Sequence, residues 1–202
     1  AASIVMATGW KPYDATKIDN LGFGKYGNVI TNVMMERLAA IGGPTRGKIT
    51  RPTDGKEVGR VAFVQCAGSR DENHLPYCST ICCLASLKQA TYVRDQYPES
   101  KVYIFYIDIR TDGLYEDFYV RVKSDEHVTF LKGKVAKIDE DPKTKDLIVE
   151  ADDILSGEKI RLRVDMVILA TGIVPVARES RIAGADMAYD EYGFTTGSQK
   201  TR

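Results

Sequence analysis

The sequence predicts an α/β fold in which helices cover a parallel sheet and a small antiparallel meander accompanies it. Three short apolar runs, at residues 61–64, 101–107 and 166–172, have the composition of strands buried on both faces. Segments with an apolar side at helical spacing separate these runs. With 202 residues, of which 44% are hydrophobic, the chain can bury one substantial core or two small ones.

The first 59 residues look less regular than the rest. Residues 1–9 read as a buried strand that ends in a tight turn at Ala7, Thr8 and Gly9. Residues 11–59 are rich in proline and glycine, with a short strand expected at 28–31 and a helix at 32–40. We expect a linker between two domains here, although an ordinary surface excursion fits equally well.

Residues 60–172 have the alternating pattern of a domain built on a parallel sheet. This order of elements is that of a dinucleotide-type, Rossmann-like domain. The expected elements are strand 61–64, helix 79–96, strand 101–107, helix 114–124, strand 128–131, a meander at 134–139, 147–151 and 159–164, and a central strand at 166–172.

All four cysteines of the chain lie between Cys66 and Cys83, with Cys78 and Cys82 between them, in the spacing C-x11-C-x3-C-C. A bond between the adjacent Cys82 and Cys83 would be strained, and disulfide frameworks belong to small secreted chains. A metal or cluster site, buried free cysteines and redox thiols remain open. Zinc favours two separated C-x2-C pairs, which are absent, whereas an iron–sulfur cluster tolerates varied spacing. We therefore favour a cluster.

Charge and hydropathy exclude some partners. The 28 basic and 28 acidic residues give zero formal net charge, so no general attraction to nucleic acid or anionic membranes is expected. No apolar run reaches the length of a membrane-spanning helix and no signal peptide opens the chain. We expect a cytoplasmic protein that reaches the inner face of a membrane only through partner subunits. Arg70 and Asp71 are expected to form a local ion pair.

The runs QCAGSRD, YCSTICC, LKQA and YIFYIDIRT resemble the A subunit of heterodisulfide reductase and its relatives. The closest resemblance is to the quinone-interacting membrane-bound oxidoreductase (Qmo) flavoprotein of sulphate reducers, and it extends from Ala7 to Ala170. It implies a thioredoxin-reductase-like flavoprotein that contains FAD and a [4Fe–4S] cluster. The cluster ligands it implies are Cys66, Cys78, Cys82 and Cys83.

The same resemblance implies a flavin site. The two turns that pass close to FAD in this superfamily correspond to Ala7, Thr8 and Gly9 and to the later residues Thr171, Gly172 and Pro175. A lysine at the position of Lys88 is expected near the isoalloxazine ring, where a cation would shift the flavin potential. The alternatives are an ordinary strand end for each turn and a solvated lysine.

The resemblance also suggests domain boundaries. We expect residues 1–10 to end the first half of an FAD domain, 11–59 to be the linker, 60–172 to form a second dinucleotide-type domain with the four cysteines, and 173–202 to start the second half of the FAD domain. The G-x-G-x-x-G spacing at residues 22–27 does not follow an expected strand as a dinucleotide-binding turn would, so we expect a fragment of a longer polypeptide; a self-contained α/β domain is the alternative. NAD(P) binding is not expected, since only one glycine follows the strand at 61–64.

The expected function is electron transfer between flavin and cluster. The Qmo-like branch implies exchange between a quinone pool and adenylylsulfate reductase, together with other Qmo- or Hdr-type subunits. Two other classes stay open: an NAD(P)H-dependent disulfide reductase that uses Cys82 or Cys83, and a zinc-stabilised binding module without redox activity.

Overall fold

The computed structural model describes residues 5, 7–177 and 187–196. The chain divides into two compact units. The larger unit is Asp14–Gly172, and the smaller one consists of the described residues of Ala1–Tyr13 and Ile173–Arg202. The chain therefore leaves the smaller unit once and returns to it once.

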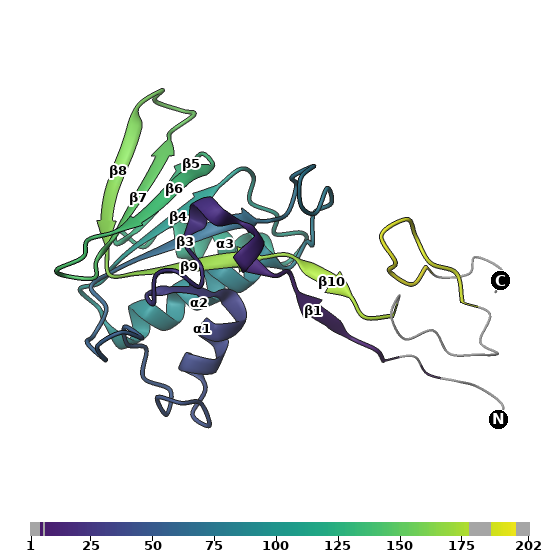
Figure 1. Ribbon diagram of the computed structural model, residues 1–202, viewed down its shortest axis with the longest axis horizontal. Helices are drawn as coiled ribbons and strands as arrows, with labels where there is room; N and C mark the ends of the chain where they lie inside the picture. The colour runs from purple at the N-terminus through teal and green to yellow at the C-terminus, as the bar shows by residue number, and fades with distance from the viewer. Residues whose placement is uncertain (1–4, 6, 178–186, 197–202) are drawn as a thin grey trace. The chain divides into compact units, whose positions relative to one another are not determined.

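A five-stranded parallel sheet forms the centre of the larger unit (Figure 1). Its strand order is β2-β9-β3-β4-β5, so the last strand of the unit lies between the first two. All six residues of β9 are buried, as its uninterrupted apolar sequence predicts. The strands are β2 (Val29–Thr31), β3 (Arg60–Ala67), β4 (Lys101–Tyr106), β5 (Val128–Lys132) and β9 (Met166–Thr171).

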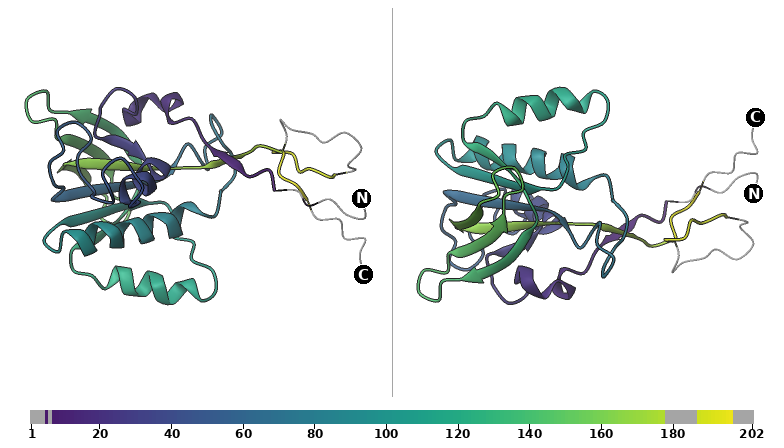
Figure 2. Two further views of the ribbon diagram at one scale, coloured as in Figure 1. Left: turned by 90° about the horizontal axis from the view of Figure 1, so that it is seen from below. Right: turned by 90° about the horizontal axis from the view of Figure 1, so that it is seen from above.

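Three helices cover one face of this sheet: α1 (Asn32–Ala39), α2 (Cys82–Gln96) and α3 (Tyr115–Lys123). Figure 2 shows α2 and α3 on one side of the sheet and the antiparallel strands on the other. Alternate residues of the strands, such as Val61 and Phe63 of β3, join Leu87 of α2 in a single apolar core. The core is therefore the layer between helices and sheet.

The antiparallel sheet of the larger unit has the order β6-β7-β8, formed by Val135–Glu140, Leu147–Asp152 and Lys159–Val164. Buried and more exposed residues alternate along β7, so one face of this meander packs inward. Two short 3-10 helices, η1 (Ala15–Lys17) and η2 (Asp19–Leu21), precede the parallel sheet in the chain, and η2 lies against β6.

The smaller unit contains one two-stranded antiparallel ribbon. Its strands β1 (Trp10–Pro12) and β10 (Ile173–Pro175) pair Trp10 with Pro175 and Pro12 with Ile173. The strand expected at residues 1–9 falls mostly outside the described residues. Ala7, Thr8 and Gly9 are not in a strand, and Gly9 adopts a left-handed φ of 68°.

The expected α/β class, the parallel sheet and the meander are confirmed. Residues 14–59, expected to be part of a linker, belong to the larger unit and supply β2 and α1 to it. The reason is burial, because Ile30 of β2 is inaccessible to solvent beside β9. Within the described ranges, none of the helices combines the length and the apolar character that crossing a bilayer requires.

Candidate functional site: the four-cysteine cluster site

Cys66 lies at the carboxyl end of β3, where the strand is irregular. The pairing of β3 with β9 shifts register between Val64 and Ala67, and Cys66 adopts a left-handed φ of 55°. Such a bulge changes the direction of a side chain relative to regular alternation. Cys66 is buried. It therefore stands at the edge of the sheet where open α/β folds usually bind ligands.

The loop between β3 and α2 is closed by its own backbone hydrogen bonds. The Leu75 amide donates to the Gly68 carbonyl at 3.0 Å, and the Arg70 amide donates to the Tyr77 carbonyl at 3.1 Å. These bonds fold the loop back so that Cys78 returns towards the end of β3. The Thr80 amide then donates to the Cys78 sulfur at 3.4 Å, with Thr80 in a left-handed conformation.

Cys82 and Cys83 are the first two residues of α2, and both are buried. The preceding residue, Ile81, makes no side-chain capping bond. The free amides and the positive end of the helix dipole therefore favour negative charge at this position. The Cys82 sulfur donates to the Thr171 carbonyl at the end of β9 at 3.5 Å, and the Cys83 sulfur donates to the Asp108 carbonyl in the segment after β4 at 3.6 Å.

Burial and neighbouring thiols raise the pKa of three of the cysteines. Burial, followed by the charge of Cys83, raises the pKa of Cys66 to about 11. Burial, followed by Cys66, Cys83 and Cys78, raises the pKa of Cys82 to about 12. Burial also raises the pKa of Cys83 against a hydrogen bond from the Arg110 backbone. Without a metal these thiols stay protonated, so a metal or cluster has to displace protons to bind.

A cation borders the thiols. Arg70 forms an ion pair with Asp108 at 2.7 Å, and its charge lowers the pKa of Cys66 against the larger effect of burial. The expected pair between Arg70 and Asp71 is wrong, because Asp71 instead binds Lys134 at 2.6 Å. The folded loop directs both residues to partners far along the chain rather than to each other.

Several buried polar groups near the cysteines have no hydrogen-bond partner among the described residues. They are both polar atoms of the Gln65 amide, Ser69 Oγ and Ser86 Oγ. Ser86 lies one helical turn beyond Cys82 and Cys83 on the same face of α2. Buried polar groups normally have partners, so this group of unpartnered atoms is what a site for a polar ligand would leave.

The donor set of the site is four cysteine thiols from one segment of the chain. Among the described residues, no three His, Cys, Asp or Glu side chains are arranged to hold one ion. In a [4Fe–4S] cluster each cysteine binds a different iron, so its ligands stand farther apart than the four ligands of one zinc ion. Four thiols are the donor set that such a cluster takes.

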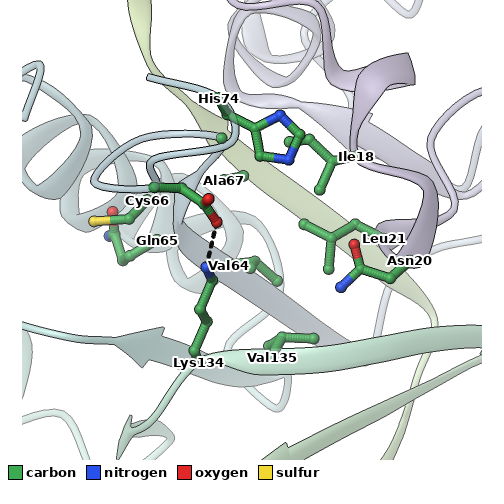
Figure 3. A pocket seen from close by; sticks show the side chains of 12 residues that line it. Ile18, Asn20, Leu21, Val64, Gln65, Cys66, Ala67, His74, Lys134 and Val135 are labelled. Atoms are coloured by element: carbon green, nitrogen blue, oxygen red, sulfur yellow. Dashed lines mark hydrogen bonds and ion pairs between the residues drawn. The ribbon is translucent and has the colours of Figure 1, made fainter. Parts of the chain in front are cut away.

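A small cavity of about 60 Å³ adjoins Cys66 on the other side of β3 (Figure 3). In Figure 3 the Cys66 sulfur and the Gln65 amide point away from Ile18 and Leu21, which line the cavity. This volume holds water and no flavin. Gln65 and Cys66 also line it, so the cavity lies at the end of β3 that carries the first cysteine.

The residues expected at the flavin site belong to different units. Thr171 and Gly172 end the larger unit, and the Thr171 hydroxyl donates to Asn32 Oδ1 at 3.1 Å. The smaller unit contains Pro175, paired with Trp10 across the ribbon, and also Ala7, Thr8 and Gly9.

Lys88 lies on α2 and forms an ion pair with Glu36 of α1 at 2.9 Å; its side chain is about half exposed. The hydrogen bond from Glu36 raises the pKa of Lys88, so the amine is a cation.

No family model matches the sequence. Curated relatives match it well. The chain is 44% identical over 175 residues to an iron-sulfur A subunit of the CoB–CoM heterodisulfide reductase of Methanopyrus kandleri, a match that covers 86% of the chain and 27% of the relative. It is also 44% identical over 173 residues to the A subunit of the H₂/formate:CoB–CoM heterodisulfide,ferredoxin reductase of Methanococcus maripaludis, covering 85% and 26%.

This chain is homologous to the A subunit of heterodisulfide reductase. It spans about a quarter of the length of these relatives. The homology supports the broader family expected from the cysteine motif, and it does not distinguish the Qmo-like branch.

Solved structures confirm the thioredoxin-reductase-like fold. The flavoprotein disulfide reductase RclA from Escherichia coli matches with a TM-score of 0.54 at 15% identity, over 95% of this chain and 35% of that one. Thioredoxin reductase of T. acidophilum matches with a TM-score of 0.52 at 16% identity, over 96% and 51%. At these identities the likeness concerns the fold alone.

The sequence interpretation overlooked Gln65, Ser69 and Ser86. Gln65 carried a usable signal, since it continues the alternation of Val61 and Phe63 on the core-facing side of a strand. A large polar residue at such a position needs a partner. Ser69 and Ser86 carried no comparable signal, because serine is common in loops and on helices.

Proposed function

We propose that Cys66, Cys78, Cys82 and Cys83 bind a [4Fe–4S] cluster, and that the chain is part of an FAD-dependent oxidoreductase that transfers electrons. The observation that carries this proposal is that all four cysteines lie at the end of β3, in the loop that follows it and at the start of α2, with Cys66, Cys82 and Cys83 buried. The homology to iron-sulfur subunits supports it.

The residues around the thiols would serve a bound cluster in distinct ways. The amino end of α2 and the Arg70 guanidinium supply positive charge next to four thiolates. The Thr80 amide already donates to the Cys78 sulfur. Burial excludes water from Cys66, Cys82 and Cys83. A cluster at this place would accept and release single electrons, while FAD exchanges two.

We further propose that Ala7, Thr8, Gly9, Thr171, Gly172 and Pro175 contribute to the FAD site. Lys88 would act on the flavin as a cation, because its amine stays protonated beside Glu36. The left-handed φ of Gly9 supports a turn that brings backbone close to a cofactor, since nothing occupies the space of a side chain there.

The proposed partners are the other subunits of an Hdr- or Qmo-type complex. In the Qmo-like version, electrons pass between a quinone pool and adenylylsulfate reductase, and the cytoplasmic chain meets the inner face of the membrane only through those subunits. This finer assignment depends on the sequence resemblance alone.

A thiol–disulfide role is less well supported. The Cys82 thiol donates to a carbonyl at the end of β9 and the Cys83 thiol to a carbonyl in the segment after β4, so the two do not face each other as a dithiol pair. Burial raises the pKa of both, whereas a nucleophilic thiol needs a lowered pKa.

The test is anaerobic analysis of iron, sulfide and zinc with a visible spectrum, on the unsubstituted chain and on Cys66→Ala, Cys78→Ala, Cys82→Ala and Cys83→Ala. We expect about four irons per chain and broad absorption near 400 nm in the unsubstituted chain, lost in each variant. Zinc without sulfide, or four free thiols after reconstitution, would contradict the proposal.

A further inference from the structure

Gln65 occupies a position that strand geometry reserves for an apolar residue. It follows Val61 and Phe63 at every second place along β3, on the face that α2 covers. Only 4% of its surface is exposed. A glutamine is therefore buried in the helix-facing layer, directly before a proposed cluster ligand.

The Gln65 amide is unusual because both of its polar atoms lack partners. Neither Nε2 nor Oε1 has a hydrogen bond within the described residues. The other buried glutamine, Gln89, uses its Nε2 to bind the Asn32 carbonyl at 2.9 Å and Glu36 at 2.8 Å. Because a buried amide without a partner destabilises the fold, an apolar side chain would be better for stability alone.

The surroundings indicate where a partner for Gln65 belongs. The bulge after Val64 changes the direction of Cys66, and Figure 3 shows the Cys66 sulfur and the Gln65 amide pointing away from Ile18 and Leu21. The Cys82 sulfur at the start of α2 donates to the Thr171 carbonyl, and Thr171 pairs with Ala67, the neighbour of Cys66. Gln65 therefore lies at the end of β3 that the start of α2 approaches.

We propose that Gln65 Nε2 donates a hydrogen bond to a sulfur of the cluster held by the four cysteines and thereby raises its reduction potential. The inference rests on the proposed function. Reduction adds negative charge to the sulfurs, so a neutral N–H donor stabilises the reduced form more than the oxidised form. The thioether of methionine has nearly the same length and no donor, so Gln65→Met removes the hydrogen bond while the volume is preserved.

The test is the reduction potential of the reconstituted full chain, measured by redox titration with EPR detection for the unsubstituted chain and Gln65→Met. We expect the equilibrium constant for reduction to fall about tenfold in Gln65→Met, which is about 59 mV for a one-electron couple. We also expect its cluster-free form to melt no lower than the unsubstituted chain, since an unpartnered amide has been removed.

Ser100→Ala is the matched control. Ser100 Oγ is likewise buried and without a partner among the described residues, but Ser100 directly precedes β4 at the opposite end of the sheet from Cys66. Its reduction potential should equal that of the unsubstituted chain. A Gln65→Met potential equal to that of Ser100→Ala would overturn the proposal.

If Gln65→Met does not bind a cluster, a second measurement tests whether the Gln65 amide contacts the cluster in the unsubstituted chain. Pulsed EPR of the reduced unsubstituted chain, with glutamine side chains labelled with ¹⁵N, should detect an amide nitrogen coupled to the cluster. Gln89 and Gln96 bind protein groups elsewhere and give no such signal. Gln199 lies outside the described residues, so the labelled chain carries Gln199→Asn. An absent coupling overturns the inference, whereas an unsubstituted chain that binds no iron overturns the four-cysteine proposal itself.

Discussion

Gly172 lies so close to Ser69 that a Cβ on the glycine would collide with the serine hydroxyl; it would also lie 2.9 Å from Ser79 Oγ. The end of β9 thus packs directly against the loop that carries Cys78. A glycine is required here by the chain's own side chains, whether or not a cofactor also approaches this backbone.

Gly172→Ala should therefore displace the cysteine loop. We expect a loss of about 1–3 kcal/mol in the free energy of unfolding, as for other overpacked sites, and a lower iron content after reconstitution. Gly42→Ala is the control, because nothing lies within 4 Å of its Cβ and its φ is not left-handed. Urea unfolding of both variants measures the loss of stability. Equal unfolding midpoints would contradict the prediction, because they would show that the cysteine loop moves aside at no cost.

A buried ion pair ties the segment before β3 to the turn between β6 and β7. Arg51 and Asp146 are 2.9 Å apart, with side chains only 7% and 13% exposed. Asp146→Ala would leave the buried Arg51 with only its longer ion pair to Asp54 at 3.4 Å, so we expect a loss of about 3 kcal/mol. Glu150→Ala, which breaks the exposed pair with Arg161 at 3.3 Å, should cost less than about 1 kcal/mol. Denaturant unfolding compares the two, and similar losses would refute the difference.

The Asp146 carboxylate also makes the free energy of unfolding depend on pH. Burial would raise the pKa of Asp146, but hydrogen bonds from Arg163, Thr144 and Arg51 outweigh it and leave the pKa below its ordinary value of 3.8. Because the folded pKa is the lower one, this stabilisation is complete above 3.8 and disappears as the pH falls through the folded value. Unfolding free energies measured from about pH 6 downwards should drop below about pH 4. Asp146→Ala should flatten that drop, and an unchanged slope would exclude Asp146 as its source.

Lys88 offers a test of the flavin assignment, because its substitution should hardly change the stability of the fold. Its ion pair with Glu36 has both side chains about half exposed, so Lys88→Met should change stability by less than about 1 kcal/mol. If Lys88 faces the flavin, loss of its charge should lower the potential of bound FAD. Lys48→Met, which breaks another exposed pair with Glu57 at 3.0 Å, should leave that potential unchanged. A flavin potential that is the same in both variants would contradict the role of Lys88.

The helices and strands were predictable because the pattern of apolar and polar residues along each segment indicates which of its faces are buried. The apolar run of β9 and the alternation of β7 specify a fully buried and a half-buried strand. The start of α2 was less accessible: the sequence predicts a helix from Ser79, but it begins at Cys82, since Thr80 adopts a left-handed φ of 57°. A threonine does not signal that conformation in sequence.

The four cysteines of the candidate site were recognisable in the sequence, whereas their surroundings were not. A cysteine is a potential metal ligand by its residue type alone, so four clustered cysteines can be recognised without a structure. The partners of Arg70 and Asp71, by contrast, depend on how the loop folds against β4 and β6, which no local pattern encodes. The unpartnered state of Gln65 likewise arises only when α2 covers the end of β3.

The pairing of Pro12 with Ile173 has a consequence for the history and engineering of the chain. Asp14–Gly172 is a continuous stretch whose two junctions adjoin neighbouring positions of one ribbon. A single insertion into a hairpin loop would create this arrangement, and domain insertions are tolerated at such sites. Asp14–Gly172 is therefore a transplantable module, with Tyr13 and Ile173 as the natural points at which to cut it out or graft it into another scaffold.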